Sequence, residues 1–253
     1  MLKIVRRLIP DWGTTYGPAG DGPFPAVMVL HGSEGAMSGW SHRNAVILAA
    51  HGFIAFPFGY SIGGNAWNAG SIENVAIDRG AEALQAFRAF PATTNKVGLY
   101  GVSRGAEYAL LLTSLMSQER MDGAPDAVAA HSPPDVICGA FDARRYRDAG
   151  DPGWTSWDVA QRAWTWRGSS EDLLPTTPIP IESFDGPLFL SHGTADRVWS
   201  VKMTERLVAR LRAAGRQPEM HLYEGQDHIP DSAGENEHHD HLIRFFGRHL
   251  AAR

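Results

Sequence analysis

The sequence predicts an α/β fold, with a mostly parallel, doubly wound sheet that carries helices on both faces. Short apolar runs alternate with longer segments of helical periodicity along most of the chain. The runs 26–32, 96–101 and 187–193 are almost entirely apolar, which is typical of parallel strands covered on both faces. Because the links between runs and helices are short, each strand–helix–strand unit fits a parallel sheet.

Each expected strand and helix follows from a local pattern. The six expected strands are short apolar runs, at 26–32, 53–59, 96–101, 126–132, 187–193 and 218–225. The four expected helices repeat apolar residues every three or four positions, at 71–90, 103–117, 200–214 and 235–251. Gly215 lies directly after the third of these helices, where glycine commonly ends a helix.

The segment 139–182 interrupts this alternation. It contains several prolines, has no clear period, and holds four tryptophans, Trp154, Trp157, Trp164 and Trp166. A structureless loop of this length is uncommon in a compact domain, so we expect a cap over the carboxyl edge of the sheet, where open α/β sheets bind ligands. The tryptophans are candidate substrate contacts, although the alternative is that most of them only pack the cap onto the body. Residues 1–253 are otherwise expected to form a single domain.

Composition narrows the function classes. Apolar residues make up 43% of the 253 residues, enough for a sizeable core, and the net charge is −5. No cluster of Lys and Arg marks a nucleic-acid or membrane surface, and no apolar run reaches transmembrane length. Cys138, the one cysteine, excludes an internal disulfide and fits a reducing compartment. We expect a soluble cytoplasmic protein with a small-molecule partner, and the sequence leaves its oligomeric state open, a homodimer included.

Ser103 lies in a G-x-S-x-G pattern between a buried strand and a helix, with Gly101 and Gly105 on either side. A nucleophile on such a sharp turn needs small residues two positions away, where larger side chains would collide with the strand and the helix. The turn also places the hydroxyl beside a helix N-terminus, where partial positive charge favours a developing oxyanion. The alternative, a turn serine without a catalytic role, is less favoured by this context.

A serine needs a base and an orienting carboxylate to act as a nucleophile near neutral pH. In this architecture the chain order is serine, acid, histidine, with the acid after the next-to-last strand and the histidine after the last. Asp196 and His228 occupy these two loops. Since both loops open at the same edge of the sheet as Ser103, the three positions predict a catalytic triad.

Other titratable residues fit these roles less well. Asp227 adjoins His228, and neighbouring residues rarely face each other in the required geometry, while Asp185 precedes its strand. His221 lies inside the last strand and is expected to be structural. No cysteine or second ligand cluster supports a metal site on the final helix. A solvated face is therefore expected for the histidines of that helix, His238, His239, His241 and His249.

Two backbone N–H groups would form an oxyanion hole. One is that of Arg104, directly after Ser103, and the other is expected from the glycine-rich loop after the first long strand, at Ser33 or Glu34. The alternative for this loop is a glycine-rich turn without a catalytic part. Glu107, in the first turn of the following helix, could pair with Arg104. No metal or organic cofactor is expected.

Several motifs resemble one family. They are HGSEG, GVSRGAE before an aliphatic helix, AWTWRG, GPLFLSHGTADRVW and a final Asp-His pair. Together they resemble the α/β-hydrolase superfamily, and within it the catalytic domain of acyl-CoA thioesterases and bile acid-CoA:amino acid N-acyltransferases, close to the dienelactone hydrolase group. The likeness runs from about Gly22 to the C-terminus, and it implies the α/β-hydrolase fold with an ester or thioester substrate.

The chain departs from that family at two places. Family acyltransferases use a cysteine nucleophile, so Ser103 favours hydrolysis over transfer to an amine. Residues 1–22 leave little room before the first long strand, so we expect the usual opening hairpin to be short or partly missing.

The function that the sequence predicts is a serine hydrolase of a carboxylic ester or acyl thioester. It would work through Ser103, His228 and Asp196 and form an acyl-enzyme. Two alternatives stay open. The same residues could serve a peptidase or an acyltransferase, and the fold could be a catalytically silent binding module.

Overall fold

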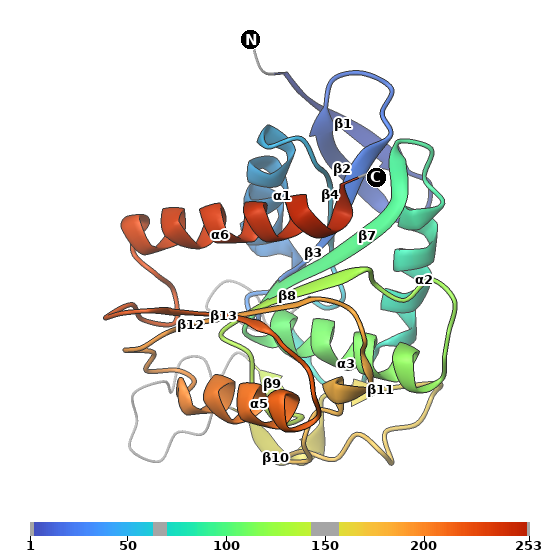
Figure 1. The fold of residues 1–253 in the computed structure, drawn as a ribbon. Coiled ribbons are helices and arrows are strands. Elements are labelled where there is room, and N and C mark those ends of the chain that lie inside the picture. The colour runs from blue at the N-terminus through green and yellow to red at the C-terminus, as the bar shows by residue number, and fades with distance from the viewer. Residues whose placement is uncertain (1–2, 63–69, 143–156, 252–253) are drawn as a thin grey trace.

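The main sheet of the computed structural model, which describes residues 3–62, 70–142 and 157–251, has eight strands. Their order is β1-β2-β4-β3-β7-β8-β12-β13. From β4 to β13 neighbouring strands run parallel, whereas β1 and β2 form an antiparallel hairpin at one edge (Figure 1). The strands are β1 (Ile4–Ile9), β2 (Gly13–Pro18), β3 (Phe24–Leu30), β4 (Ile54–Phe58), β7 (Thr93–Val102), β8 (Ala127–His131), β12 (Leu188–Gly193) and β13 (Glu219–Tyr223).

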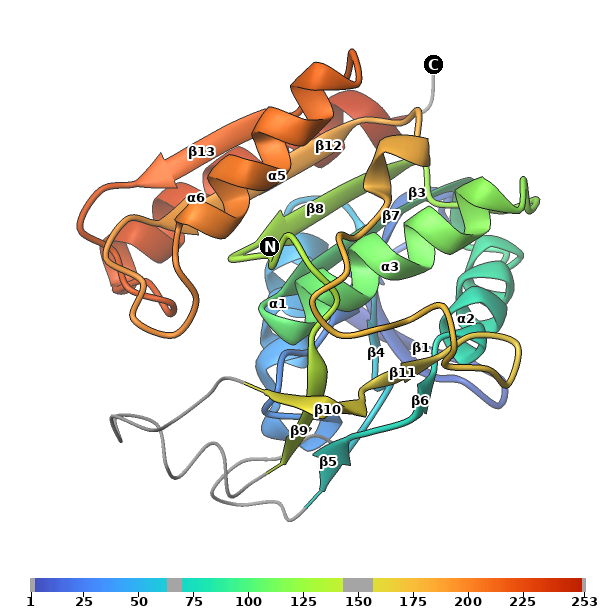
Figure 2. The same cartoon turned by 90° about the horizontal axis from the view of Figure 1, so that it is seen from below.

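Helices cover both faces of this sheet. One face carries α2, α3 and α5, and the other carries α1 and α6 (Figures 1 and 2). Each face of the sheet packs against its helices in a hydrophobic core, and strand β3 contributes side chains to both cores. Met28 and Leu30 pack toward α2 and α3, while Val27 and Val29 pack toward α1 and α6. Within the described ranges, no helix is long and apolar enough to cross a membrane. The helices are α1 (Trp40–Ala50), α2 (Asp78–Arg88), α3 (Arg104–Gln118), α5 (Lys202–Ala213) and α6 (Ser232–Leu250).

The structure confirms the predicted α/β class and all six expected strands, with shifts of a few residues at their ends. The expected helix at 71–90 begins only at Asp78. Residues before it form two short strands instead, β5 (Ser71–Ile72) and β6 (Val75–Ala76). These strands pair with the segment 139–182, which a reading of local periodicity could not reveal.

Two elements near the N-terminus differ from expectation. The prediction of a short or partial opening hairpin was wrong, because β1 and β2 pair from Ile4↔Pro18 to Ile9↔Gly13. Helix α1 was not predicted at all. Its buried face includes Ser41 and Asn44, so the sequence lacks the apolar stripe that marks a helix. Asn44 Oδ1 accepts a hydrogen bond from His239 Nε2 at 2.8 Å, which satisfies this buried polar group.

The described part of the segment 139–182 forms small sheets beside the carboxyl edge of the main sheet (Figure 2). In these sheets β9 (Gly139–Asp142) pairs with β10 (Asp158–Arg162) and β5, and β11 (Trp164–Thr165) pairs with β6. Residues 143–156 of the expected cap, with Trp154, lie outside the described residues. The rest of the segment is thus tied to the body by strand pairing.

Buried histidines lie behind the carboxyl edge of the sheet, contrary to the expected solvated face on the final helix. His238 and His239 are both buried. His238 Nε2 lies 2.8 Å from the hydroxyl of Tyr100, and its ring centroid lies 4.7 Å from that of His131 in β8. The helical repeat of α6 therefore turns two of its histidines into the core, where the Tyr100 hydroxyl satisfies His238 and the side chain of Asn44 satisfies His239.

We predict that the protein loses stability as the pH falls below about 6.5. Burial lowers the pKa of His31 to about 4 and that of His131 to about 3, and it also lowers the pKa of His238. Between these values and the ordinary 6.5, the unfolded chain binds more protons than the folded one. Each such histidine should therefore reduce the free energy of unfolding by about 1.4 kcal/mol per pH unit in this window.

Urea unfolding followed by tryptophan fluorescence from pH 7.5 to 4.5 measures this effect. His131→Gln should flatten the slope, whereas His51→Gln, at an exposed position, should leave it unchanged. A free energy of unfolding that stays level between pH 7 and 5 would contradict the prediction.

Candidate active site

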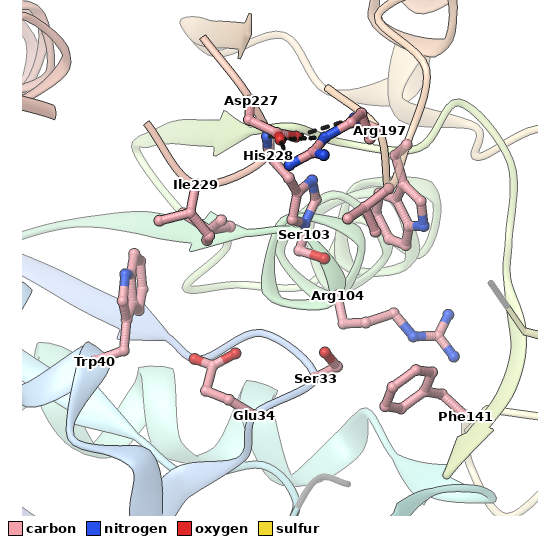
Figure 3. Close-up of a pocket in the computed structure, with 13 residues that line it drawn as sticks. Ser33, Glu34, Trp40, Ser103, Arg104, Phe141, Arg197, Asp227, His228 and Ile229 are labelled. Carbon is pink, nitrogen blue, oxygen red and sulfur yellow. Dashed lines mark hydrogen bonds and ion pairs between the residues drawn. The ribbon is translucent and has the colours of Figure 1, made fainter. Parts of the chain in front are cut away.

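A pocket of about 630 Å³ opens at the carboxyl edge of the sheet (Figure 3). This volume lies within the range of small-molecule sites. Its apolar lining comes from five different segments, through Trp40, Val102, Phe141, Val198, Trp199 and Ile229. The polar groups that line it include all the residues expected for the triad and the oxyanion hole except Asp196, namely Ser33, Glu34, Ser103, Arg104 and His228. The loops after β3, β7, β12 and β13 thus meet at one place.

Ser103 sits on a strained turn between β7 and α3. Its backbone has φ 56° and ψ −121°, a conformation that non-glycine residues rarely adopt. A Cβ at Gly101 would lie 2.2 Å from the carbonyl oxygen of Gly105, and one at Gly105 would lie 2.4 Å from that of His31. The two glycines are therefore required by backbone contacts. The N–H of Ser103 donates to the carbonyl of His131 at 3.0 Å and ties the turn to the neighbouring strand.

The acid and the imidazole meet in the loops after β12 and β13. His228 Nδ1 lies 2.7 Å from Asp196 Oδ2, and Asp196 Oδ1 accepts from the backbone N–H groups of Val198 and Trp199 at 2.8 Å each. Burial acts to raise the pKa of Asp196, but hydrogen bonds from His192 and His228 outweigh it and hold that pKa well below its usual range. The carboxyl is thus ionised and accepts a hydrogen bond from the Nδ1 edge of the His228 ring.

His228 lies over Ser103 at the pocket wall (Figure 3). Since Nδ1 donates to the carboxylate of Asp196, Nε2 is the ring nitrogen left to accept a proton. The ring packs against Trp199 in an edge-on contact, with centroids 6.0 Å apart. An imidazole held in this way beside a serine hydroxyl is chemically able to act as a general base.

Asp227 has a different task from Asp196. Its carboxylate accepts from Arg197 Nε at 2.6 Å and from the backbone N–H groups of Arg197 and His228, at 3.1 and 2.7 Å. It therefore links the loop after β12 to the loop after β13. This link fixes the distance between the segments that carry the acid and the histidine.

Ser33 and Glu34 form the wall opposite His228, in the loop after β3 (Figure 3). Glu34 Oε1 accepts from the N–H of Gly32 at 2.9 Å, which fixes the loop. Burial raises the pKa of Glu34, and the hydrogen bond from Gly32 opposes that effect. Arg104 is the first residue of α3, so its N–H belongs to the turn in which helical N–H groups have no intrahelical acceptor.

The expected tryptophan contacts lie elsewhere. Trp164 is fully buried, and its Nε1 donates to Glu107 Oε1 at 2.7 Å. Trp166 Nε1 donates to Glu119 at the surface, and Trp157 packs edge-on against Trp199. These three side chains are absent from the described pocket lining, whereas Trp154 lies outside the described residues.

Trp40 and Trp199 line the pocket, and reasoning from the sequence missed both. Each had a signal in the sequence, since Trp199 follows Asp196 by three residues and Trp40 follows the loop of Ser33. A search for aromatic residues within a few positions of the predicted site residues would have found them.

Arg104 and Glu107 form a buried ion pair beneath the pocket. Arg104 Nη1 donates to Glu107 Oε2 at 2.7 Å, as expected, and both side chains are almost completely shielded from solvent. Glu107 Oε1 also accepts from the N–H of Cys138 at 2.6 Å and from Trp164. One carboxylate thus joins the helix that follows Ser103 to the start of the inserted segment and to Trp164 near its middle.

Comparison with known proteins gives a family and a fold. A family model described as the prolyl oligopeptidase family matches residues 74–253. Acyl-coenzyme A thioesterase 6 of Mus musculus is 25% identical over 218 residues, which is 83% of this chain and 49% of that protein. The chain therefore spans about half the length of the curated relative that it matches.

Among the solved structures that are similar to this chain, two examples match it along nearly its whole length. Carboxyl esterase 2 from the mycorrhizal fungus Tuber melanosporum has a TM-score of 0.68 at 14% identity, covering 99% of this chain and 86% of its own. A dienelactone hydrolase-like promiscuous phosphotriesterase from metagenomic libraries has a TM-score of 0.64 at 13% identity, covering 99% of both chains. These similarities show the α/β-hydrolase fold, as the motifs predicted.

We predict that Gly101→Ala and Gly105→Ala each destabilise the protein by about 1–3 kcal/mol or more, because the added carbon would overlap backbone atoms that cannot move freely. Gly247→Ala is the matched control. The added carbon would meet nothing within 4 Å on an exposed face of α6, so the change should stabilise the protein by about 0.5–1 kcal/mol. Urea denaturation measures all three, and a Gly101→Ala variant as stable as Gly247→Ala would refute the steric explanation.

We predict that Glu107→Gln costs about 3–5 kcal/mol of stability, because it leaves the buried Arg104 cation without its counter-charge. Glu119→Gln provides the comparison, since Glu119 also binds an arginine and a tryptophan indole, but at the surface. That change should cost no more than about 1 kcal/mol. Equal losses in thermal or urea unfolding would show that burial does not set the strength of the Arg104 pair.

Proposed function

Because the chain belongs to the prolyl oligopeptidase family, we propose that it is a serine hydrolase that cleaves a carboxylic ester or an acyl thioester. The observation that carries this proposal is the 2.7 Å hydrogen bond between His228 Nδ1 and Asp196 Oδ2, beside a pocket that holds Ser103. An imidazole oriented in this way leaves Nε2 to accept the proton of a hydroxyl.

The proposed reaction proceeds through an acyl-enzyme. Ser103 Oγ attacks the acyl carbonyl while His228 Nε2 takes the hydroxyl proton, and Asp196 stabilises the imidazolium that forms. His228 then gives this proton to the leaving alcohol or thiol as its bond to the acyl carbon breaks. A water molecule, deprotonated by His228, attacks the acyl-enzyme and releases the acid and the free serine.

The developing negative charge would be held by backbone N–H groups of Arg104 and of Ser33 or Glu34. These segments face each other across the pocket, one at the start of α3 and one in the loop after β3. Losing one such donor typically raises the barrier by about 2.7–4 kcal/mol. The partial positive charge of the helix N-terminus adds to this stabilisation.

The apolar pocket supports an acyl substrate over a polar one. Trp40, Phe141 and Trp199 offer aromatic surface on both sides of Ser103, as the labelled side chains in Figure 3 show for two of them. Burial of an aliphatic or aromatic acyl group there would supply binding energy at about 25 cal/mol per Å². The thioesterase relative agrees with this substrate class, although the chain matches only about half of its length.

A peptidase is the second candidate, and the matching family model favours it. An acyltransferase is the third, because an acyl-enzyme can pass its acyl group to an amine instead of water. Turnover of a peptide anilide tests for a peptidase, since it requires cleavage of an amide bond and release of the aniline. Added amine acceptors test for an acyltransferase, because that enzyme would release an acyl–amine conjugate in place of the free acid.

We predict that Ser103→Ala reduces ester turnover by about 10⁴-fold or more, since no covalent step remains. The measurement is kcat/KM on p-nitrophenyl esters and acyl-CoA thioesters of graded acyl length, for wild type and variant. Ser117→Ala on α3 is the matched control and should retain the wild-type rate. The best substrates should carry apolar acyl groups, given the pocket lining.

A fluorophosphonate probe separates an enzyme from a binding module that lacks catalysis. The probe should label wild type and the Ser117→Ala variant but not Ser103→Ala. Folded wild-type protein that takes up no label, and turns over none of the esters, would overturn the proposed function.

A further inference from the structure

A second histidine lies against the carboxylate of Asp196. His192 Nε2 is 3.0 Å from Asp196 Oδ2, the oxygen that also accepts from His228. His192 is the penultimate residue of β12, and its side chain is fully buried. It does not line the pocket, so any effect that it has on chemistry must pass through Asp196.

The surroundings of His192 define which nitrogen carries its proton. Nε2 also lies 3.0 Å from the carbonyl oxygen of Trp199, so both groups facing this nitrogen can only accept. Nε2 must therefore be protonated. In the neutral ring Nδ1 is then an acceptor, and it lies 2.7 Å from the hydroxyl of Thr204 in α5, which donates to it.

We propose that Thr204 and His192 are positioning residues that extend the chain of hydrogen bonds behind the catalytic acid. Thr204 fixes the ring of His192, and the Nε2–H of His192 holds Asp196 and the Trp199 carbonyl in place. This inference rests on the proposed function, because it assigns a role toward the same acid. It adds one strand residue and one helix residue to the machinery, neither of which contacts substrate.

The second donor has a definite electrostatic consequence. A carboxylate oxygen that accepts two N–H groups is a weaker acceptor toward each of them. Removing the His192 donor leaves more negative charge facing His228, which favours the imidazolium. The free enzyme should then lose its active, neutral histidine at a higher pH, so the acid limb of kcat/KM moves upward.

Other titratable or charged groups also face Asp196 and His228, and they must stay constant in the test. They lie on four segments: Glu34 in the loop after β3, His131 at the end of β8, and the Arg197–Asp227 pair that joins the loops after β12 and β13. None of these residues contacts His192 or Thr204 in the hydrogen bonds described. A shift of the acid limb on changing His192 or Thr204 therefore reports on Asp196.

The main experiment compares His192→Phe with His192→Gln, using pH profiles of kcat and kcat/KM on the best ester of the panel. His192→Phe removes the donor and keeps a buried ring, so the acid limb should move up by roughly 0.5–1 pH unit. The plateau of kcat should fall about 2- to 10-fold with little change in KM, the fold-change expected for one lost hydrogen bond. His192→Gln places an amide N–H near the Nε2 position and should stay close to wild type.

A second pair of variants covers the case that His192→Phe does not fold. Thr204→Val removes the hydroxyl at nearly constant volume and should shift the limb in the same direction by a smaller amount, while Thr204→Ser should restore it. Thr113→Val is the matched control, since Thr113 is a fully buried helical threonine whose hydroxyl donates to the Ala109 carbonyl of its own helix at 2.6 Å. It should lower stability without moving the limb.

The proposal is overturned if a folded His192→Phe or Thr204→Val variant keeps the wild-type acid limb, or if His192→Gln shifts it as far as His192→Phe. Nitrogen-15 NMR of the wild-type histidine side chains tests it without any turnover. His192 should appear as the neutral Nε2–H form, and an Nδ1–H form would refute the proposed role. Because this readout needs no substrate, failure of the proposed Thr204–His192–Asp196 hydrogen-bond chain is distinguishable from failure of the proposed hydrolase activity.

Discussion

The close approach of backbones at the end of β7 is the constraint on which the site depends. Gly101 and Gly105 let α3 begin within contact distance of both β7 and the loop after β3. Ser103 is forced into a positive φ at this point and projects from the turn toward the pocket. The same approach brings the first N–H groups of α3 opposite Ser33 and Glu34, so one steric arrangement places both the hydroxyl and its candidate oxyanion donors.

The residues that follow this strained turn contact segments that are distant in the sequence. The Arg104–Glu107 pair starts at the residue after Ser103 and ends at the backbone of Cys138 and the indole of Trp164. A carboxylate with several donors is costly to bury but strongly directional once it is paired. The inserted segment therefore packs against the helix of the nucleophile through a defined polar contact, and the aromatic residues of that segment contribute to the core.

Asp196, like Glu107, is a buried carboxylate that accepts hydrogen bonds from several donors. Its two oxygens face the backbone of the 198–199 loop, His228 and His192, which together keep the buried carboxyl ionised. Asp227 accepts hydrogen bonds from Arg197, so the loop that carries Asp196 is bonded to the loop that carries His228. In a low-dielectric setting such fixed dipoles need no reorganisation when charge develops, which is the main electrostatic advantage of a preorganised site.

The sequence by itself determined the six parallel strands of the main sheet, four of the helices that cover it, the glycine-flanked turn, and the loops that hold Ser103, Asp196 and His228. These follow from local patterns, because the carboxyl ends of parallel strands must share one edge of a sheet. Only the tertiary structure decided which tryptophans reach the pocket, that His238 and His239 are buried, and that His192 meets Thr204. Those outcomes depend on how elements distant in sequence rotate and pack against each other, and the period of an isolated helix or strand carries no record of its partner.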